Sequence, residues 1–265
     1  MRSPRRPNAS HSKHLSSGRI CDYGYQGDAV KLVSRPKGRV HYEGLLLDMN
    51  GTFMFGEDRF GPNEDFYDTY VRLGGGSLSP EEVRVLIRRV YDRMAMDYAN
   101  PLLLDDFPSV AETLTRFSGA TIEDAPILER VFAAHEIGQV PIEFAECLRR
   151  LRDDFIIGIV SNIWARKDAW LEHFAEVGIQ SLWCAAVFSS DTCSIKPSQV
   201  LFRRAIADLG LSPSTILFVG DSLASDILPA KAAGMHTAWI GPAARPHPSA
   251  DWTATSLLAL ASALQ

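Results

Sequence analysis

Short apolar runs recur along the chain, and each is closed by a polar residue or a glycine. Leu45–Leu47, Phe155–Val160 and Ile216–Val219 are apolar at nearly every position, which is typical of strands buried on both faces of a sheet. We expect strands over about 43–48, 155–160, 185–188, 216–219 and 236–240. Segments of helical period alternate with these runs. The pattern therefore predicts an α/β fold, a Rossmann-like, doubly wound parallel sheet with helices on both faces.

Between the first two predicted strands the chain has a helical period only. Ser79-Pro80-Glu81-Glu82 is a strong helix start, with an N-cap, a proline at the first helical position and acids in the first turn. The apolar stripe of this helix is interpreted as core packing, with Met94, Met96 and Tyr98 as alternative pocket-lining residues. Helices are expected over about 62–73, 80–98, 108–118 and 123–137.

This helical block predicts a cap inserted into an α/β core. We expect the core over residues 41–60 and 141–265 and the helical cap over residues 61–140. The turn-rich segment Phe53–Gly61 is expected to form a hairpin flap over the end of the first strand. Core helices are expected over about 141–152, 165–177, 196–209 and 255–264, with another beginning at Asp226.

Charge is distributed unevenly along the chain. The whole chain carries a formal net charge of −5, but residues 1–41 contain nine Lys and Arg against two Asp, so the remainder is strongly acidic. Residues 1–40 are rich in Ser, Pro, Gly and basic residues, which favours a disordered leader or an over-extended start over an arm that contacts an anionic surface. The acidic body argues against a nucleic-acid partner.

The four cysteines, Cys21, Cys147, Cys184 and Cys193, show no metal-binding or disulfide spacing, which fits a reducing cytoplasm. Residues 1–40 lack the apolar segment of a secretory signal, and no apolar run approaches membrane-spanning length. We therefore expect a cytoplasmic protein without a membrane contact. The oligomeric state stays open.

Polar residues follow the predicted strands where each strand ends. Asp48, Ser161 and Asp221 close three apolar runs, and Lys196 lies in the loop after another. In an open α/β sheet, ligands bind beyond the carboxyl ends of the strands. Together these residues supply a nucleophilic carboxylate, a hydroxyl donor, a cation and acidic ligands for a hard metal ion.

These residues resemble the motifs of the haloacid dehalogenase superfamily, most of whose members are phosphatases. The resemblance covers about residues 43–264 and lies in DMNGT from Asp48, in Ser161 after IGIV, in SIKPS around Lys196, and in GDSLASD from Gly220 to Asp226. The last motif and the following AKAAGM are similar to the branch with a helical cap after the first motif.

The resemblance implies a role for each matching residue. Asp48 would attack phosphorus and form an aspartyl-phosphate, while Ser161 and Lys196 would contact the phosphoryl group. Thr52 would hold the loop, and Gly51 and Asn162 would join the phosphate-binding residues. Mg²⁺ would be held by Asp48, the backbone carbonyl of Asn50, Asp221 and, directly or through water, Asp226. The implied substrate is a small phosphorylated metabolite.

Asn50 departs from the family pattern. The family's phosphatases have a second aspartate here, which protonates the leaving oxygen and then activates water. An amide has no proton to exchange in this way, and losing a general acid typically costs about 10²–10⁴-fold in rate. We therefore expect slow turnover of ordinary phosphomonoesters. Because Asn50-Gly51 is a deamidation-prone pair, a modified fraction with a restored carboxylate is a further hypothesis for trace activity.

Three explanations of Asn50 stay open. One is a slow or specialised phosphatase in which Glu57 or Asp58 supplies the proton. The second is a non-catalytic phospholigand-binding module, and the third is an introduced Asp→Asn trap. Dehalogenation is less favoured: family dehalogenases also lack the second aspartate but work without a metal, whereas this chain keeps Asp221 and Asp226.

Overall fold

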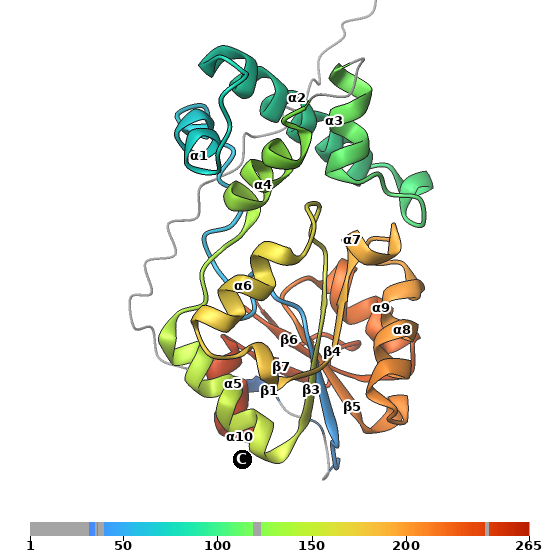
Figure 1. Ribbon diagram of the computed structural model, residues 1–265. Helices are drawn as coiled ribbons and strands as arrows, with labels where there is room; N and C mark the ends of the chain where they lie inside the picture. The colour runs from blue at the N-terminus through green and yellow to red at the C-terminus, as the bar shows by residue number, and fades with distance from the viewer. Residues whose placement is uncertain (1–31, 35, 37–39, 119–122, 242–243, 265) are drawn as a thin grey trace, which may run out of the picture.

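A single twisted sheet organises the molecule (Figure 1). The computed structural model describes residues 32–34, 36, 40–118, 123–241 and 244–264. The sheet has the order β1-β7-β6-β5-β2-β3-β4. All neighbouring strands pair in parallel except β1, which runs antiparallel to β7. The strands are β1 (Leu32–Ser34), β2 (Gly44–Leu47), β3 (Ile156–Ser161), β4 (Trp183–Phe188), β5 (Ile216–Gly220), β6 (His236–Ile240) and β7 (Trp252–Ala254).

The sheet is buried on both faces because its central strands are apolar at successive positions. Leu45 and Leu47 of β2 belong to the larger hydrophobic core, whereas Leu46 points the other way into a second core. Helices α5 (Ile142–Asp154), α6 (Asp168–Glu176) and α10 (Leu257–Leu264) cover the first face, and α8 (Gln199–Leu209) and α9 (Leu228–Ala232) cover the second (Figure 1). This arrangement confirms the predicted Rossmann-like α/β fold.

Four helices lie together beyond the carboxyl end of the sheet (Figure 1). They are α1 (Phe66–Arg72), α2 (Pro80–Tyr98), α3 (Val110–Ser118) and α4 (Ala125–Glu136), with a short 3₁₀ turn η1 (Pro101–Leu103) after α2. Helix α2 begins as its sequence indicates, with reciprocal capping hydrogen bonds between Ser79 and Glu82. The domain boundaries at residues 61 and 140 stay predictions.

The two chain segments that join these helices to the sheet pair with each other. Residues 55–59 run antiparallel to residues 135–139, and we call these two segments the linker pair. Phe55 and Gln139 exchange backbone hydrogen bonds of 2.9 and 2.8 Å, and the Asp58 and Arg59 amides donate to the carbonyls of Glu136 and His135. The predicted hairpin within 53–61 is therefore wrong, because the backbone of this segment makes its hydrogen bonds with residues 135–139 instead of forming a hairpin.

Several elements differ from expectation. Strand β7 was not predicted, and the short helix α7 (Ser189–Thr192) precedes the loop that carries Lys196. The π-helical turn η4 (Leu223–Ile227) precedes α9, and the 3₁₀ turns η2 (Gln180–Leu182) and η3 (Pro213–Thr215) lead into β4 and β5. Residues 32–34, assigned to the leader, instead form β1 because they pair with β7. The rest of the disorder prediction for residues 1–40 falls largely outside the described residues.

Candidate active site

The site lies where the strand order reverses. From β2 the chain proceeds through β3 and β4 on one side, and then through β5, β6 and β7 on the other. Leu47 of β2 lies beside Ile159 of β3 and Val219 of β5, so the residues that follow all three strands emerge together. Such a reversal leaves a crevice at the carboxyl ends of the strands. The sheet register thus brings Asp48, Ser161 and Asp221 to one place.

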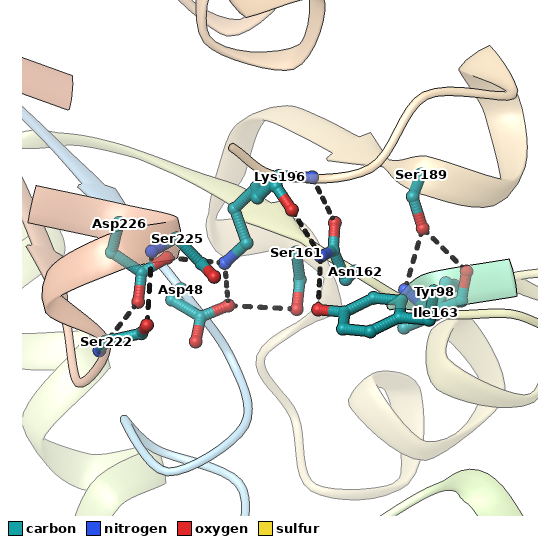
Figure 2. A network of polar contacts seen from close by, with 10 residues as sticks. All are labelled: Asp48, Tyr98, Ser161, Asn162, Ile163, Ser189, Lys196, Ser222, Ser225 and Asp226. Atoms are coloured by element: carbon teal, nitrogen blue, oxygen red, sulfur yellow. Dashed lines mark hydrogen bonds and ion pairs between the residues drawn. The ribbon is translucent and has the colours of Figure 1, made fainter. Parts of the chain in front are cut away.

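Asp48 is the centre of a buried polar network (Figure 2). The Ser161 hydroxyl donates to Asp48 Oδ1 at 3.1 Å, and the Lys196 ammonium donates to the same oxygen at 2.6 Å. Among the described residues no hydrogen bond is made to the other oxygen, Oδ2. Asp48 therefore has one oxygen fixed by two donors and one oxygen available to a ligand.

Lys196 links two aspartates across the site (Figure 2). Its ammonium lies 2.7 Å from Asp226 Oδ1, while the other Asp226 oxygen accepts the Ser222 backbone amide at 3.0 Å. Burial alone would lower the pKa of Lys196, but the charges of Asp226 and Asp48 outweigh it and raise that pKa. Lys196 therefore stays a cation although it is only 4% exposed.

Asp48, Asp221 and Asp226 form a carboxylate cluster. Each offers an oxygen, and the three oxygens lie within 4.8 Å of one another. Burial raises the pKa of Asp221 to about 7, with further contributions from the charges of Asp48 and Asp226. One ammonium cannot balance three carboxylates, whereas a hard divalent cation, which prefers oxygen ligands, would. The donor set and its excess negative charge therefore fit Mg²⁺.

The turn after β2 makes room for Asp221 in the carboxylate cluster. Gly51 has φ +70°, and a Cβ on it would lie 2.3 Å from Asp221 Oδ2. Asn50 lines the same cavity as the carboxylate cluster, and its Oδ1 is buried without a hydrogen-bond partner among the described residues. Thr52 is buried, its hydroxyl also lacks such a partner, and neither Thr52 nor Gly51 lines the cavity. Their predicted contact with phosphate stays a prediction.

Asn162 connects the sheet to helix α2. Its Nδ2 donates to the Tyr98 hydroxyl at 2.9 Å, and its Oδ1 accepts the Lys196 backbone amide at 2.8 Å (Figure 2). Tyr98 thus reaches the site from the end of α2. Of the three alternative pocket-lining residues of this helix, Tyr98 lines the cavity, while Met94 is buried in the core and Met96 is 70% exposed.

These side chains surround a cavity of about 310 Å³. Seven of the predicted site residues line it: Asp48, Asn50, Ser161, Asn162, Lys196, Asp221 and Asp226. Glu57 and Asp58, the candidate proton donors, also line it. Desolvation by the surrounding protein raises the pKa of both, that of Asp58 to about 6 with a contribution from the charge of Glu57.

Sequence reasoning missed Glu136, Trp164, Ser222 and Ser225, which also line the cavity. The Glu136 carboxylate accepts the backbone amides of Trp164 and Ala165 at 2.5 and 2.8 Å, tying the end of α4 to the loop after β3. Burial raises the pKa of Glu136 to about 8, against the lowering effect of these two hydrogen bonds. No local motif marks Glu136; the only signal was its place near the end of the predicted cap.

The model of the haloacid dehalogenase-like hydrolase family matches residues 42–234. The chain belongs to this family of hydrolases. The matched region contains the whole carboxylate cluster, Ser161 and Lys196, so the family assignment and the site geometry concern the same residues.

Solved structures of haloacid dehalogenase-like proteins share the fold. A phosphatase from Thermococcus onnurineus is 23% identical, with 84% of this chain and 97% of that chain covered and a TM-score of 0.57. A 2-haloacid dehalogenase from Pseudomonas syringae is 20% identical, with 84% and 98% covered and a TM-score of 0.54. The putative hydrolase YfnB from Bacillus subtilis, solved with magnesium, is 18% identical, with 85% and 99% covered and a TM-score of 0.52.

These similarities establish the fold, and they include both phosphatases and dehalogenases. No curated protein matches the chain. Among the described helices, none is both long and apolar enough to cross a membrane.

Proposed function

We propose that this protein is a Mg²⁺-dependent phosphohydrolase that acts on a small phosphorylated metabolite through an aspartyl-phosphate at Asp48. One observation carries the proposal: Asp48 lies in hydrogen-bond contact with both Ser161 and Lys196, and within one carboxylate cluster with Asp221 and Asp226. Phosphoryl transfer is catalysed mainly by positioning and by charge stabilisation, and this arrangement supplies both.

Asp48 is the nucleophile in this proposal. Its carboxylate attacks phosphorus, the bond to the leaving oxygen breaks, and the phosphoryl group passes to the carboxylate. Ser161 and Lys196 lie 3.1 and 2.6 Å from Asp48 Oδ1, and they would also donate hydrogen bonds to the phosphoryl oxygens of a bound substrate. Water then attacks the aspartyl-phosphate and releases phosphate.

Mg²⁺ would be held by Asp48, Asp221 and the backbone carbonyl of Asn50, and when bound it would neutralise phosphoryl charge. Asp226 has both oxygens engaged, one by Lys196 and one by the Ser222 amide. Its role is therefore to position Lys196 and to reach the ion through water. Such a role accounts for its burial, with only 1% of the residue exposed.

Asn50 makes the proposed enzyme slow. Its amide cannot protonate the leaving oxygen or deprotonate the attacking water. Substrates with good leaving groups lose the least rate, because their leaving oxygen needs little protonation in the first step. Glu57 and Asp58 are the carboxyl groups nearest in sequence that line the same cavity, and they are the candidates for the missing proton transfer.

The cavity suits a small substrate. Its volume of about 310 Å³ is near the lower end of the usual range for ligand sites. The helices of residues 61–140 are proposed to act as the cap that closes over it. The cytoplasmic location inferred from the cysteine spacing, and the absence of nucleic-acid and membrane partners, stay predictions.

The decisive test compares this chain with Asn50→Asp on a panel of phosphomonoesters. We expect the replacement to raise turnover about 10²–10⁴-fold, because it restores a titratable group beside the nucleophile. Asn100→Asp, the same chemical change outside the cavity, is the matched control and should have no effect. Intact-mass analysis of the unmodified chain excludes activity from deamidated Asn50.

Two results would contradict the proposal. If neither the chain nor Asn50→Asp hydrolyses any phosphomonoester but both bind phosphorylated ligands, the protein is a phospholigand-binding module. If the chain releases halide from a haloacid and keeps that activity in a chelator, it is a dehalogenase.

A further inference from the structure

The charges around the cavity bear on the substrate. We propose that the cavity selects phosphomonoesters whose alcohol portion carries an ammonium group and rejects those with a second anionic group. This inference rests on the proposed function, because it concerns the part of the substrate that leaves when phosphate is transferred.

The charge balance of the site leaves no spare cation. The positive charges of one divalent ion and of the Lys196 ammonium together equal the negative charge of the three carboxylates in the cluster, so no positive charge is left to balance a substrate. A bound phosphoryl group therefore brings uncompensated negative charge into a cavity with few charged donors. A second anionic group on the same substrate would meet further repulsion, while a cation would relieve it.

The rest of the wall adds acids rather than bases. Glu57 and Asp58 of the linker pair line the cavity, and Glu57 Oε2 is buried without a hydrogen-bond partner among the described residues. The third carboxylate of the linker pair, Glu136, is already held by two backbone amides. Glu57 is thus the carboxylate best able to accept a hydrogen bond from an ammonium group.

Lys196 is the only basic side chain among the described residues that line the cavity. The nearby arginines are engaged elsewhere. Arg59 of the linker pair donates to the backbone carbonyls of Gly56 and Ile137, Arg88 of α2 contacts the Phe60 carbonyl, and Arg93 of α2 pairs with Asp97 at 2.8 Å. A second phosphate or a carboxylate would find no basic partner on the described wall.

Two aromatic rings supply a further surface for a cation. Tyr98 and Trp164 line the cavity with their ring centroids 5.8 Å apart. Trp164 is fixed by ring contacts with Tyr91 and Phe107, and Tyr98 is fixed by its hydrogen bond to Asn162. Trp and Tyr faces attract ammonium groups, more strongly where water is excluded. Acid and aromatic side chains together therefore favour a cationic alcohol portion.

The test uses three probes of similar size with Mg²⁺ present: phosphoethanolamine, hydroxyethyl phosphate and phosphoglycolate. Their alcohol portions are cationic, neutral and anionic in turn. We expect kcat/KM to fall in that order, with about tenfold or more between the first and the last. Calorimetric titration of the same probes measures affinity independently of turnover and should give the same order.

Glu57→Gln tests the charge directly. The ratio of kcat/KM for phosphoethanolamine to that for phosphoglycolate should fall about fivefold or more. A ratio is the right measure because Glu57 is also a candidate proton donor, and a general loss of turnover cancels from it. Asp106→Asn, which removes an exposed carboxylate outside the cavity wall, is the matched control and should leave the ratio unchanged.

The outcomes separate this inference from the proposed function. Turnover of all three probes at equal efficiency, or a preference for phosphoglycolate, would overturn the inference and leave the phosphohydrolase proposal standing. Preferential binding of phosphoethanolamine without any turnover, even by Asn50→Asp, would support the ligand class and overturn the enzymatic proposal. An unchanged ratio in Glu57→Gln would contradict the inference that the negative charge of Glu57 selects an ammonium group.

Discussion

At the scale of a single residue, the absence of a side chain at Gly51 makes room for Asp221 in the carboxylate cluster. It has φ +70°, and a Cβ there would lie 2.3 Å from Asp221 Oδ2. Gly51→Ala should therefore displace Asp221 and weaken Mg²⁺ binding, in addition to a backbone strain of about 1–2 kcal/mol. Titration with Mg²⁺ and thermal unfolding measure the two effects separately.

Gly210→Ala is the control for this prediction. Gly210 has φ +68° but nothing lies within 4 Å of a Cβ placed on it. Both variants should lose similar stability from backbone strain, and only Gly51→Ala should lose Mg²⁺ affinity. Equal Mg²⁺ affinity in the two variants would show that Asp221 does not need this glycine.

Single residues also show where sequence reasoning succeeds and fails. Asp48, Lys196 and Asp221 were identified because each follows a strand in a fixed order, and parallel strands bring such positions together. Glu136 and Trp164 were missed because their place on the cavity wall depends on the pairing of distant segments. Spacing along the chain carries no signal of that pairing.

At the scale of elements, the linker pair holds a carboxyl group whose protonation stabilises the fold. Asp58 is exposed at the cavity wall, but desolvation of its carboxyl group by the surrounding protein, with a contribution from the charge of Glu57, raises its pKa to about 6. The folded protein therefore keeps this proton to higher pH than the unfolded chain. The stabilisation is complete below about pH 4 and is lost as pH rises through 6. Asp58→Asn should therefore become more stable relative to the unmodified protein over this range.

Asparagine is a suitable replacement because residue 58 has φ +58°, which asparagine tolerates. Chemical denaturation at several pH values between about 4 and 7 checks the prediction. If the free energies of unfolding of the two proteins ran parallel over that range, the protonation of Asp58 would not contribute to stability.

Elements were predicted best where their pattern was long and apolar. Strand β5 is buried at every position, and helix α2 has both a capping box and a clear stripe, so both were identified from sequence. Strand β7 has three residues, and its central one is the polar but buried Thr253. Such a short strand has no readable period, and its pairing with β6 and β1 defines it.

At the scale of the whole molecule, the order of the strands assembles the site. The reversal at β2 places the carboxyl ends of β2, β3 and β5 side by side, and helices α1–α4 lie beyond that edge (Figure 1). The sequence predicted a doubly wound parallel sheet because the alternation of strands and helices admits few arrangements, but it did not predict the strand order. It did not predict how residues 55–59 and 135–139 pair, and that pairing carries three acids to the cavity.

The most direct test of the central claim is the covalent state of Asp48. Because Asn50 slows the second step more than a first step with a good leaving group, incubation with acetyl phosphate and Mg²⁺ should leave one phosphoryl group on the protein. Peptide mapping by mass spectrometry should locate it at Asp48, and Asp48→Asn or a chelator should abolish it. A chain that stays unmodified at Asp48, or that carries the phosphoryl group elsewhere, would contradict the account.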